Sequence, residues 1–207
     1  MYSNYGEVVA THGKVHDYLG MTLDFRKEGC MIVDMSEYTG KMVEELKEKY
    51  ELCGMAKTFA KESLFHPSEG ELLSAEMAAN FHMYIAKGLF SRQRSRPNAK
   101  TVVLAMMMRV KEPRESDWEI LLQYMKFLDS TWSKVLTLSA DSLHVIKWYV
   151  DASFAVHPDF WSHLGGVMTM GGEAIQSLLK KQKLNMKSSC ESELVRADDA
   201  SGAVLWT

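Results

Sequence analysis

The chain has 207 residues, of which 46% are hydrophobic, and a formal net charge of −3. This length allows one domain or two small ones, and the hydrophobic fraction is sufficient to form a core. A dedicated nucleic-acid-binding domain is usually basic overall, so the charge argues against tight autonomous binding, although local basic segments can still bind phosphate.

The three cysteines, Cys30, Cys53 and Cys190, are far apart and form no Cys-x-x-Cys pair. This pattern argues against a disulfide framework or a zinc site and indicates a reducing, intracellular setting. The first ten residues lack the basic start and apolar run of a signal peptide. No segment approaches the roughly 20 apolar residues that cross a bilayer. We therefore expect a soluble intracellular protein with no membrane association, in either the cytoplasm or the nucleus.

The chain begins with a strand-like pattern. Apolar residues recur at every second position over much of 14–25, which predicts a single half-buried strand. Residues 26–29 predict a turn, and 31–35 a returning strand. Apolar residues at helical spacing then predict a helix at 36–50, with Ser36 as its N-cap.

Three further helices are predicted after an irregular segment at 51–70. The first begins at Ser74. The second begins at Pro97, whose fixed φ suits the first turn of a helix. The third begins at Ser116, because Ser116 and Glu119 have the spacing of a capping box.

The periodicity changes from helical to strand-like after Ser130. Apolar runs punctuated by glycine then predict four strands and a last helix, at 134–140, 143–154, 164–170, 174–179 and 189–204. We therefore expect an α+β protein with a domain boundary near residue 132.

Four segments of the first half resemble copia-type retrotransposon Pol polyproteins, in the order and at the spacing of that family. They read VHDYLGMTLDF (15–25), MSEYTGKMVEEL (35–46), RSRPNAKTVV (94–103) and YMKFLDST (124–131). The first is similar to the palm strand that follows the polymerase active site of the family.

The second half is more similar to the same family. The segment WYVDASFAVHPDFWSHLGGVMTMGGEAI (148–175) resembles the start of its ribonuclease H domain, and KKQKLNMKSSCESELV (180–195) resembles the stretch that follows. Each motif alone is weak, and their shared order along nearly the whole chain is what makes the resemblance specific.

The resemblance implies a fold and a division of the chain. Residues 1–132 would be the C-terminal portion of a reverse transcriptase, with a palm hairpin followed by thumb or connection helices. Residues 133–207 would be a truncated ribonuclease H-like domain, an incomplete mixed sheet with one helix. The partners implied are an RNA–DNA hybrid and the missing remainder of the Pol polyprotein.

The resemblance also implies a magnesium site. Ribonuclease H chemistry uses two Mg²⁺ ions held by clustered carboxylates. Asp151 and Glu193 match the first two catalytic and metal-binding carboxylates of the family. Glu191 is the alternative to Glu193, because residues two apart in a helix lie about 200° apart around its axis and only one can face the site.

This site is expected to be incomplete, because the family has further carboxylates on a later strand and beyond. The chain also contains no Tyr-x-Asp-Asp polymerase box. We therefore expect an inactive fragment of an enzyme when the chain is isolated. The alternative is a non-catalytic, domesticated or decayed module that binds nucleic acid or a protein partner. The basic residues Lys180, Lys181, Lys183 and Lys187 would contact the phosphates of a bound duplex. The alternative is that they form only a solvated strand end.

Overall fold

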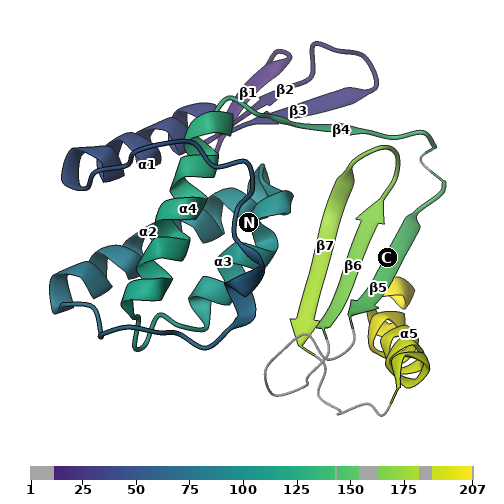
Figure 1. Cartoon of the computed structure of the whole chain (residues 1–207). Helices are drawn as coiled ribbons and strands as arrows, with labels where there is room; N and C mark the ends of the chain where they lie inside the picture. The colour runs from purple at the N-terminus through teal and green to yellow at the C-terminus, as the bar shows by residue number, and fades with distance from the viewer. Residues whose placement is uncertain (1–11, 143, 154–162, 182–187, 207) are drawn as a thin grey trace, which may run out of the picture.

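The computed structural model describes residues 12–142, 144–153, 163–181 and 188–206, and within them the chain is a mixed α+β protein (Figure 1). The described residues form two small antiparallel sheets and five α-helices. The α+β class predicted from the sequence is therefore confirmed. The prediction about a signal peptide concerns the N-terminal segment, which lies outside the described residues.

The first sheet has the strand order β1-β2-β3-β4. Its strands are β1 (Val15–Tyr18), β2 (Met21–Asp24), β3 (Cys30–Asp34) and β4 (Leu136–Ser139). All neighbouring strands pair antiparallel. The predicted turn at 26–29 is confirmed, and Gly29 takes a positive φ of 69° there.

The single strand predicted at 14–25 is wrong, because the chain reverses in its middle. Leu19 and Gly20 both take a positive φ, 49° and 74°, as the two central residues of a type I′ hairpin turn do. Val15 is thereby paired with Asp24. Val15 lies on the face opposite to Met21 and Leu23. The apolar residues that alternate along 14–25 in the sequence therefore lie on both faces of the sheet.

Four helices form one layer beside this sheet (Figure 1). They are α1 (Ser36–Lys49), α2 (Ala75–Arg94), α3 (Lys100–Met107) and α4 (Glu115–Thr131). Short 3₁₀ turns, η1 (Glu62–Phe65) and η2 (Pro97–Ala99), precede α2 and α3. The irregular segment predicted at 51–70 is confirmed apart from η1.

The helix starts were predicted with mixed success. Ser74 is the N-cap of α2, and its side chain accepts a hydrogen bond from the Met77 N–H. Ser36 is not a cap, because the Asp34 carboxylate accepts the Ser36 N–H at 2.7 Å. The box predicted at Ser116 is also wrong: α4 begins one residue earlier, and Asp117 accepts the Arg114 N–H at 2.9 Å.

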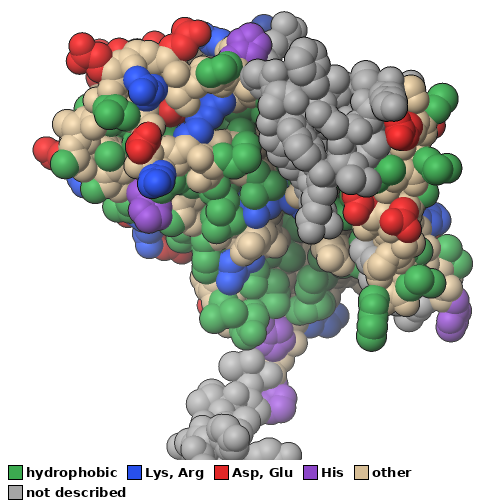
Figure 2. All heavy atoms as spheres, turned by 90° about the horizontal axis from the view of Figure 1, so that it is seen from below, with side chains coloured by type: hydrophobic (Ala, Val, Ile, Leu, Met, Phe, Trp, Pro, Cys, Tyr) green, Lys and Arg blue, Asp and Glu red, His purple; other side chains and the backbone are tan. Residues whose placement is uncertain are grey.

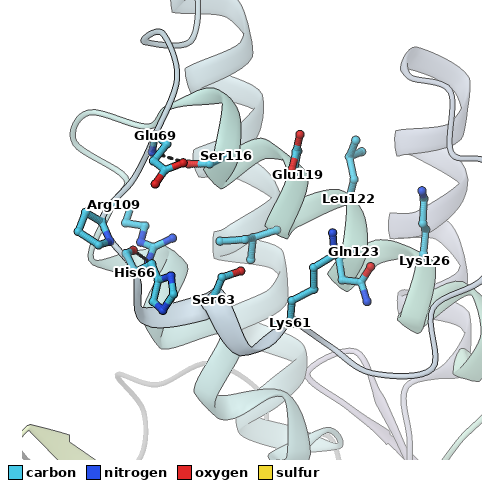
Figure 3. A pocket seen from close by; sticks show the side chains of 13 residues that line it. Lys61, Ser63, His66, Glu69, Arg109, Ser116, Glu119, Leu122, Gln123 and Lys126 are labelled. Atoms are coloured by element: carbon cyan, nitrogen blue, oxygen red, sulfur yellow. Dashed lines mark hydrogen bonds between the residues drawn. The ribbon is translucent and has the colours of Figure 1, made fainter. Parts of the chain in front are cut away.

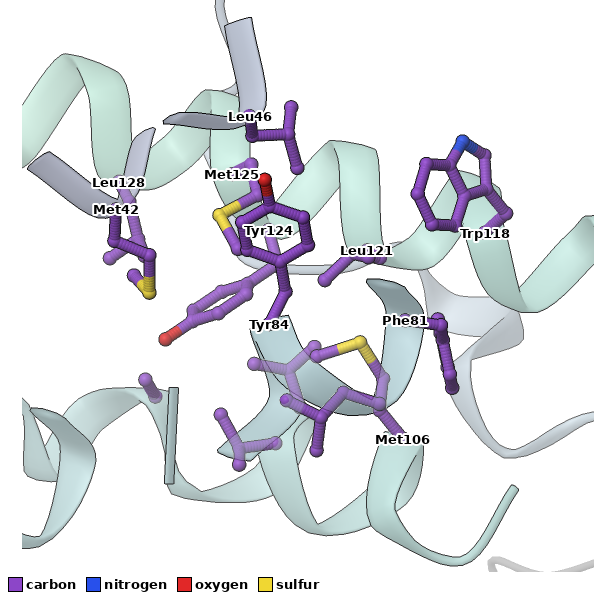
Figure 4. Close-up of a cluster of buried hydrophobic side chains, with 14 of the residues drawn as sticks. Met42, Leu46, Phe81, Tyr84, Met106, Trp118, Leu121, Tyr124, Met125 and Leu128 are labelled. Carbon is purple, nitrogen blue, oxygen red and sulfur yellow. The ribbon is translucent and has the colours of Figure 1, made fainter. Parts of the chain in front are cut away.

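The main hydrophobic core lies among these four helices (Figure 4). Its largest fully buried side chains include Met42, Phe81, Tyr84, Met106 and Tyr124. They come from all four helices, so the apolar stripes of these helices share one core.

The second sheet is formed by β5 (Lys147–Ser153), β6 (His163–Thr169) and β7 (Ala174–Lys181), in that order. Helix α5 (Ser189–Leu205) packs against β5. All three strands pair antiparallel. The described strands therefore contain no parallel pair of the kind that the predicted mixed sheet needs.

The four strands predicted in the second half all exist, but they do not belong to one sheet. Strand β4 pairs with β3 in the first sheet, and it connects the two sheets across the top of the molecule in Figure 1. The division between the two sheets thus falls after Ser139. The predicted domain boundary near residue 132 stays a prediction.

Candidate functional site

Asp151 lies near the C-terminal end of β5 and is paired with Gly165 on β6. Side chains of a strand alternate between its faces, so Asp151 shares a face with Tyr149, which is 61% exposed. The opposite face carries Trp148 and Val150, which pair with Met168 and with the buried Gly166 on β6. Asp151 is exposed, and β5 thus presents this carboxylate on the solvent-facing side of the sheet.

Glu193 lies in the second turn of α5, and its side chain is exposed. The helix starts because Ser188 is its N-cap and accepts the Glu191 N–H at 3.2 Å. Glu191 itself lies in the first turn, where a negative side chain stabilises the positive end of the helix dipole. Stabilisation of the helix therefore explains an acidic residue at position 191, but it does not explain one at position 193.

The fold brings the elements of Asp151 and Glu193 together, since α5 packs against β5. Carboxylate oxygens are the ligands that magnesium prefers. Within the described ranges, however, no group of three or more His, Cys, Asp or Glu side chains could hold a metal ion. The two carboxylates are therefore of the type that binds magnesium, but the described residues do not supply enough ligands for a site. We assign no catalytic step to a metal here.

The predicted phosphate-binding lysines fall at the end of β7 and beyond it. Lys180 and Lys181 are the last two residues of β7, and their side chains lie outside the described part of the structure. Lys183 and Lys187 lie outside the described residues altogether. On the face shown in Figure 2, the described basic side chains are scattered among hydrophobic ones and form no continuous patch.

One pocket was not foreseen from the sequence. It has a volume of about 510 Å³ and lies between the segment around η1 and α4 (Figure 3). Both charge signs line it, with Lys61, Glu69, Glu119 and Lys126 among the residues. A sequence pattern could not reveal it, because one wall comes from the irregular segment at 51–70.

Arg109 lines the same pocket, but its guanidinium is already used to hold the pocket together. Its Nη2 donates to the carbonyls of Leu64 and His66, at 2.5 and 2.8 Å. Its Nη1 pairs with Asp117 at 2.9 Å. These bonds fix the irregular segment onto α4, so Arg109 shapes the pocket and has few donors left for a ligand.

Comparisons with known proteins identify no relative. No protein-family model matches the chain, and no curated protein or solved structure matches it. Among the described residues, no helix has both the length and the apolar character needed to span a membrane.

Proposed function

We propose that this chain is part of a copia-type retrotransposon Pol polyprotein, comprising the C-terminal part of the reverse transcriptase and the N-terminal part of the ribonuclease H domain. The order of family-like motifs along the sequence is what suggests this assignment. Its parent would copy RNA into DNA and cleave the RNA strand of the resulting hybrid.

One structural observation supports the proposal more than any other. The second sheet is an antiparallel meander, β5-β6-β7, and the helix that follows packs on the first strand. Asp151 and Glu193, the two residues that match family carboxylates, lie on that strand and that helix. The strand and the helix that carry the two matching carboxylates are therefore neighbours, which supports the proposal.

The proposed chemistry is hydrolysis of a phosphodiester. By the resemblance, Asp151 and Glu193 would be two of the carboxylates that hold magnesium for this reaction. Because only two of the family's carboxylates are matched in this chain, Asp151 and Glu193, we propose that the chain alone is inactive. The absence of a Tyr-x-Asp-Asp box in these 207 residues supports the same conclusion for polymerase activity.

The sequence of the transcript and its flanking DNA tests this assignment directly. We expect the reading frame, or a spliced or decayed form of it, to continue upstream into a Tyr-x-Asp-Asp box and downstream into an Asp-bearing strand. Unrelated sequence on both sides would contradict the assignment.

An extended chain that carries these additional segments then allows an activity test. We expect magnesium-dependent cleavage of an RNA–DNA hybrid, lost in Asp151→Asn and in Glu193→Gln. The matched control is Glu191→Gln, which removes an identical carboxylate from another side of α5 and should retain activity. Loss of activity in the Glu191 variant alone would reverse the assignment of these two glutamates.

A non-catalytic module is the second candidate, favoured by the lack of a three-ligand group among the described residues. Such a module would bind nucleic acid with an affinity that falls steeply with salt, without cleaving it. Cleavage by the extended chain would exclude this alternative.

A further inference from the structure

A groove of about 360 Å³ lies where the helical layer meets the second sheet. Its walls come from the C-terminal end of α2, from α3, and from strands β4 and β7. Three of its lining residues are basic: Arg92 and Arg94 from α2, and Lys100 from α3. None is acidic, although the chain as a whole has a net charge of −3.

Lys100 is fixed at the edge of the second sheet. Its ammonium donates to the carbonyl oxygen of Ser177 on β7, and its Nζ lies 3.1 Å from the Ser177 hydroxyl. An ammonium has three N–H donors, so these two bonds leave one for a further acceptor. The contact holds the charge between two elements that are 77 residues apart in the sequence.

Arg92 and Arg94 have no carboxylate partner among the described residues. Arg94 stacks on the Phe90 ring at 3.7 Å and donates to the Phe90 carbonyl at 3.3 Å. The buried Nε of Arg92 has no hydrogen-bond partner. No ion pair in the described part of the chain includes Arg92, Arg94 or Lys100.

Helix stability does not account for this cluster. Arg92 and Arg94 lie in the last turn of α2, where cations are favourable. Lys100, however, is the first residue of α3, where the helix dipole disfavours a cation. Burial, and then the charge of Arg92, lower the pKa of Lys100 to about 8. A partly buried ammonium at the start of a helix costs free energy, and a bound anion would offset that cost.

The remaining walls suit the body of a nucleotide. Gln93 and Gln176 offer amide donors and acceptors, and Leu104, Leu136 and Leu138 provide apolar surface. We propose that this groove binds the phosphate group of a nucleotide, either free or within a nucleic-acid strand. The site is separate from Asp151 and Glu193, and its existence does not depend on the ribonuclease assignment.

Binding to the full chain tests this proposal with three ligands: inorganic phosphate, adenosine monophosphate and a short fluorescently labelled DNA strand. Lys100→Gln and Arg94→Gln should each weaken binding about tenfold or more, because each removes a charged donor. Lys100→Arg keeps the charge and should retain most of the affinity. Lys111→Gln is the control, since Lys111 is exposed and does not line the groove, and it should change affinity less than about twofold.

The pH and salt dependence distinguish this site from a general charge effect. The groups lining the groove that titrate or carry charge are Lys100, Arg92 and Arg94. Because Lys100 loses its proton as the pH rises through its pKa of about 8, adenosine monophosphate should bind less tightly at alkaline pH to the native chain but not to Lys100→Arg. If the strand is the ligand, each Gln variant should reduce the salt slope of binding by about one.

The pattern of results identifies the source of the phosphate. Variant-sensitive binding of the mononucleotide without strand binding would indicate a free nucleotide, and variant-sensitive strand binding a nucleic acid. Failure of all three ligands to bind at millimolar concentration would overturn the proposal. So would an equal loss of binding in Lys111→Gln, provided that circular dichroism shows all variants to be folded.

Discussion

Arg109 and Asp117 form an ion pair in which Arg109 Nη1 lies 2.9 Å from Asp117 Oδ1 and the Asp117 side chain is fully buried. The same carboxylate accepts the Ser68 hydroxyl at 2.8 Å and the Arg114 N–H at 2.9 Å. The pair therefore joins the start of α4 to the irregular segment that precedes α2.

Removal of the cation from this pair should destabilise the protein strongly. In Arg109→Met, Asp117 remains buried with no compensating charge, and the free energy of unfolding should fall by about 3–5 kcal/mol. Urea denaturation of both proteins measures this difference. The control is Lys47→Met, which breaks an exposed ion pair with Asp129 of 2.7 Å and should cost no more than about 1 kcal/mol. Equal losses in the two variants would show that the burial of Asp117 does not matter.

Gly171 should tolerate no side chain. A Cβ atom at this position would lie 2.1 Å from the Ser139 carbonyl oxygen, a backbone atom that cannot move aside easily. Gly171→Ala should therefore lower the free energy of unfolding by about 1–3 kcal/mol, as overpacking does. At the neighbouring Gly172 a Cβ would meet nothing within 4 Å, so Gly172→Ala provides a matched control in the same turn. Similar thermal midpoints for the two variants would contradict the close approach of this turn to β4.

Gly20 is required by the backbone of the β1–β2 hairpin and not by space. Its φ is +74°, while a Cβ would lie 3.8 Å from the Phe90 ring, an ordinary contact. Gly20→Ala should cost about 1–2 kcal/mol, which is the penalty for a side chain in the left-handed region. Gly40→Ala should have the opposite sign and stabilise by about 0.5–1 kcal/mol, because Gly40 lies inside α1 with room for a methyl group. Denaturation of the two variants side by side checks both signs.

Tyr124 should contribute to loss of stability in alkali. Its side chain is fully buried, and burial raises its pKa well above the ordinary value of about 10. Above pH 10 the unfolded chain releases this proton while the folded chain keeps it. The unfolded state then binds fewer protons, and stability falls as pH rises, by up to about 1.4 kcal/mol per pH unit.

Tyr124→Phe removes this titration. Its stability should decline less steeply above pH 10 than that of the native chain. At pH 7 the substitution should be close to neutral or slightly stabilising, because the buried hydroxyl has no hydrogen-bond partner. Urea denaturation at a series of pH values measures both effects, with the exposed Tyr149→Phe as control. An unchanged alkaline slope in Tyr124→Phe would show that the phenol does not titrate in this range.

Much of the candidate site was predictable from the sequence, because it depends on local pattern. The strand that carries Asp151 and the helix that carries Glu193 were both predicted and are confirmed. The groove around Lys100 was not predictable in the same way. Its charges come from α2 and α3, and the carbonyl that fixes Lys100 belongs to Ser177. No spacing pattern within one segment encodes a contact between such distant parts of the chain.

The sequence by itself determined the order and type of nearly all the elements, and the start of α2 at Ser74, because hydrophobic periodicity and a capping side chain act over a few residues. Only the tertiary structure decided which strands pair. Strand β4 joins β3 across about a hundred intervening residues, although a sequence pattern groups it with the strands that follow. The N-cap position of α4 was decided in the same way, because the Ser116 hydroxyl accepts the N–H of Glu69 from the irregular segment. Pairing and packing depend on which surfaces bury one another, and a local pattern does not specify that choice.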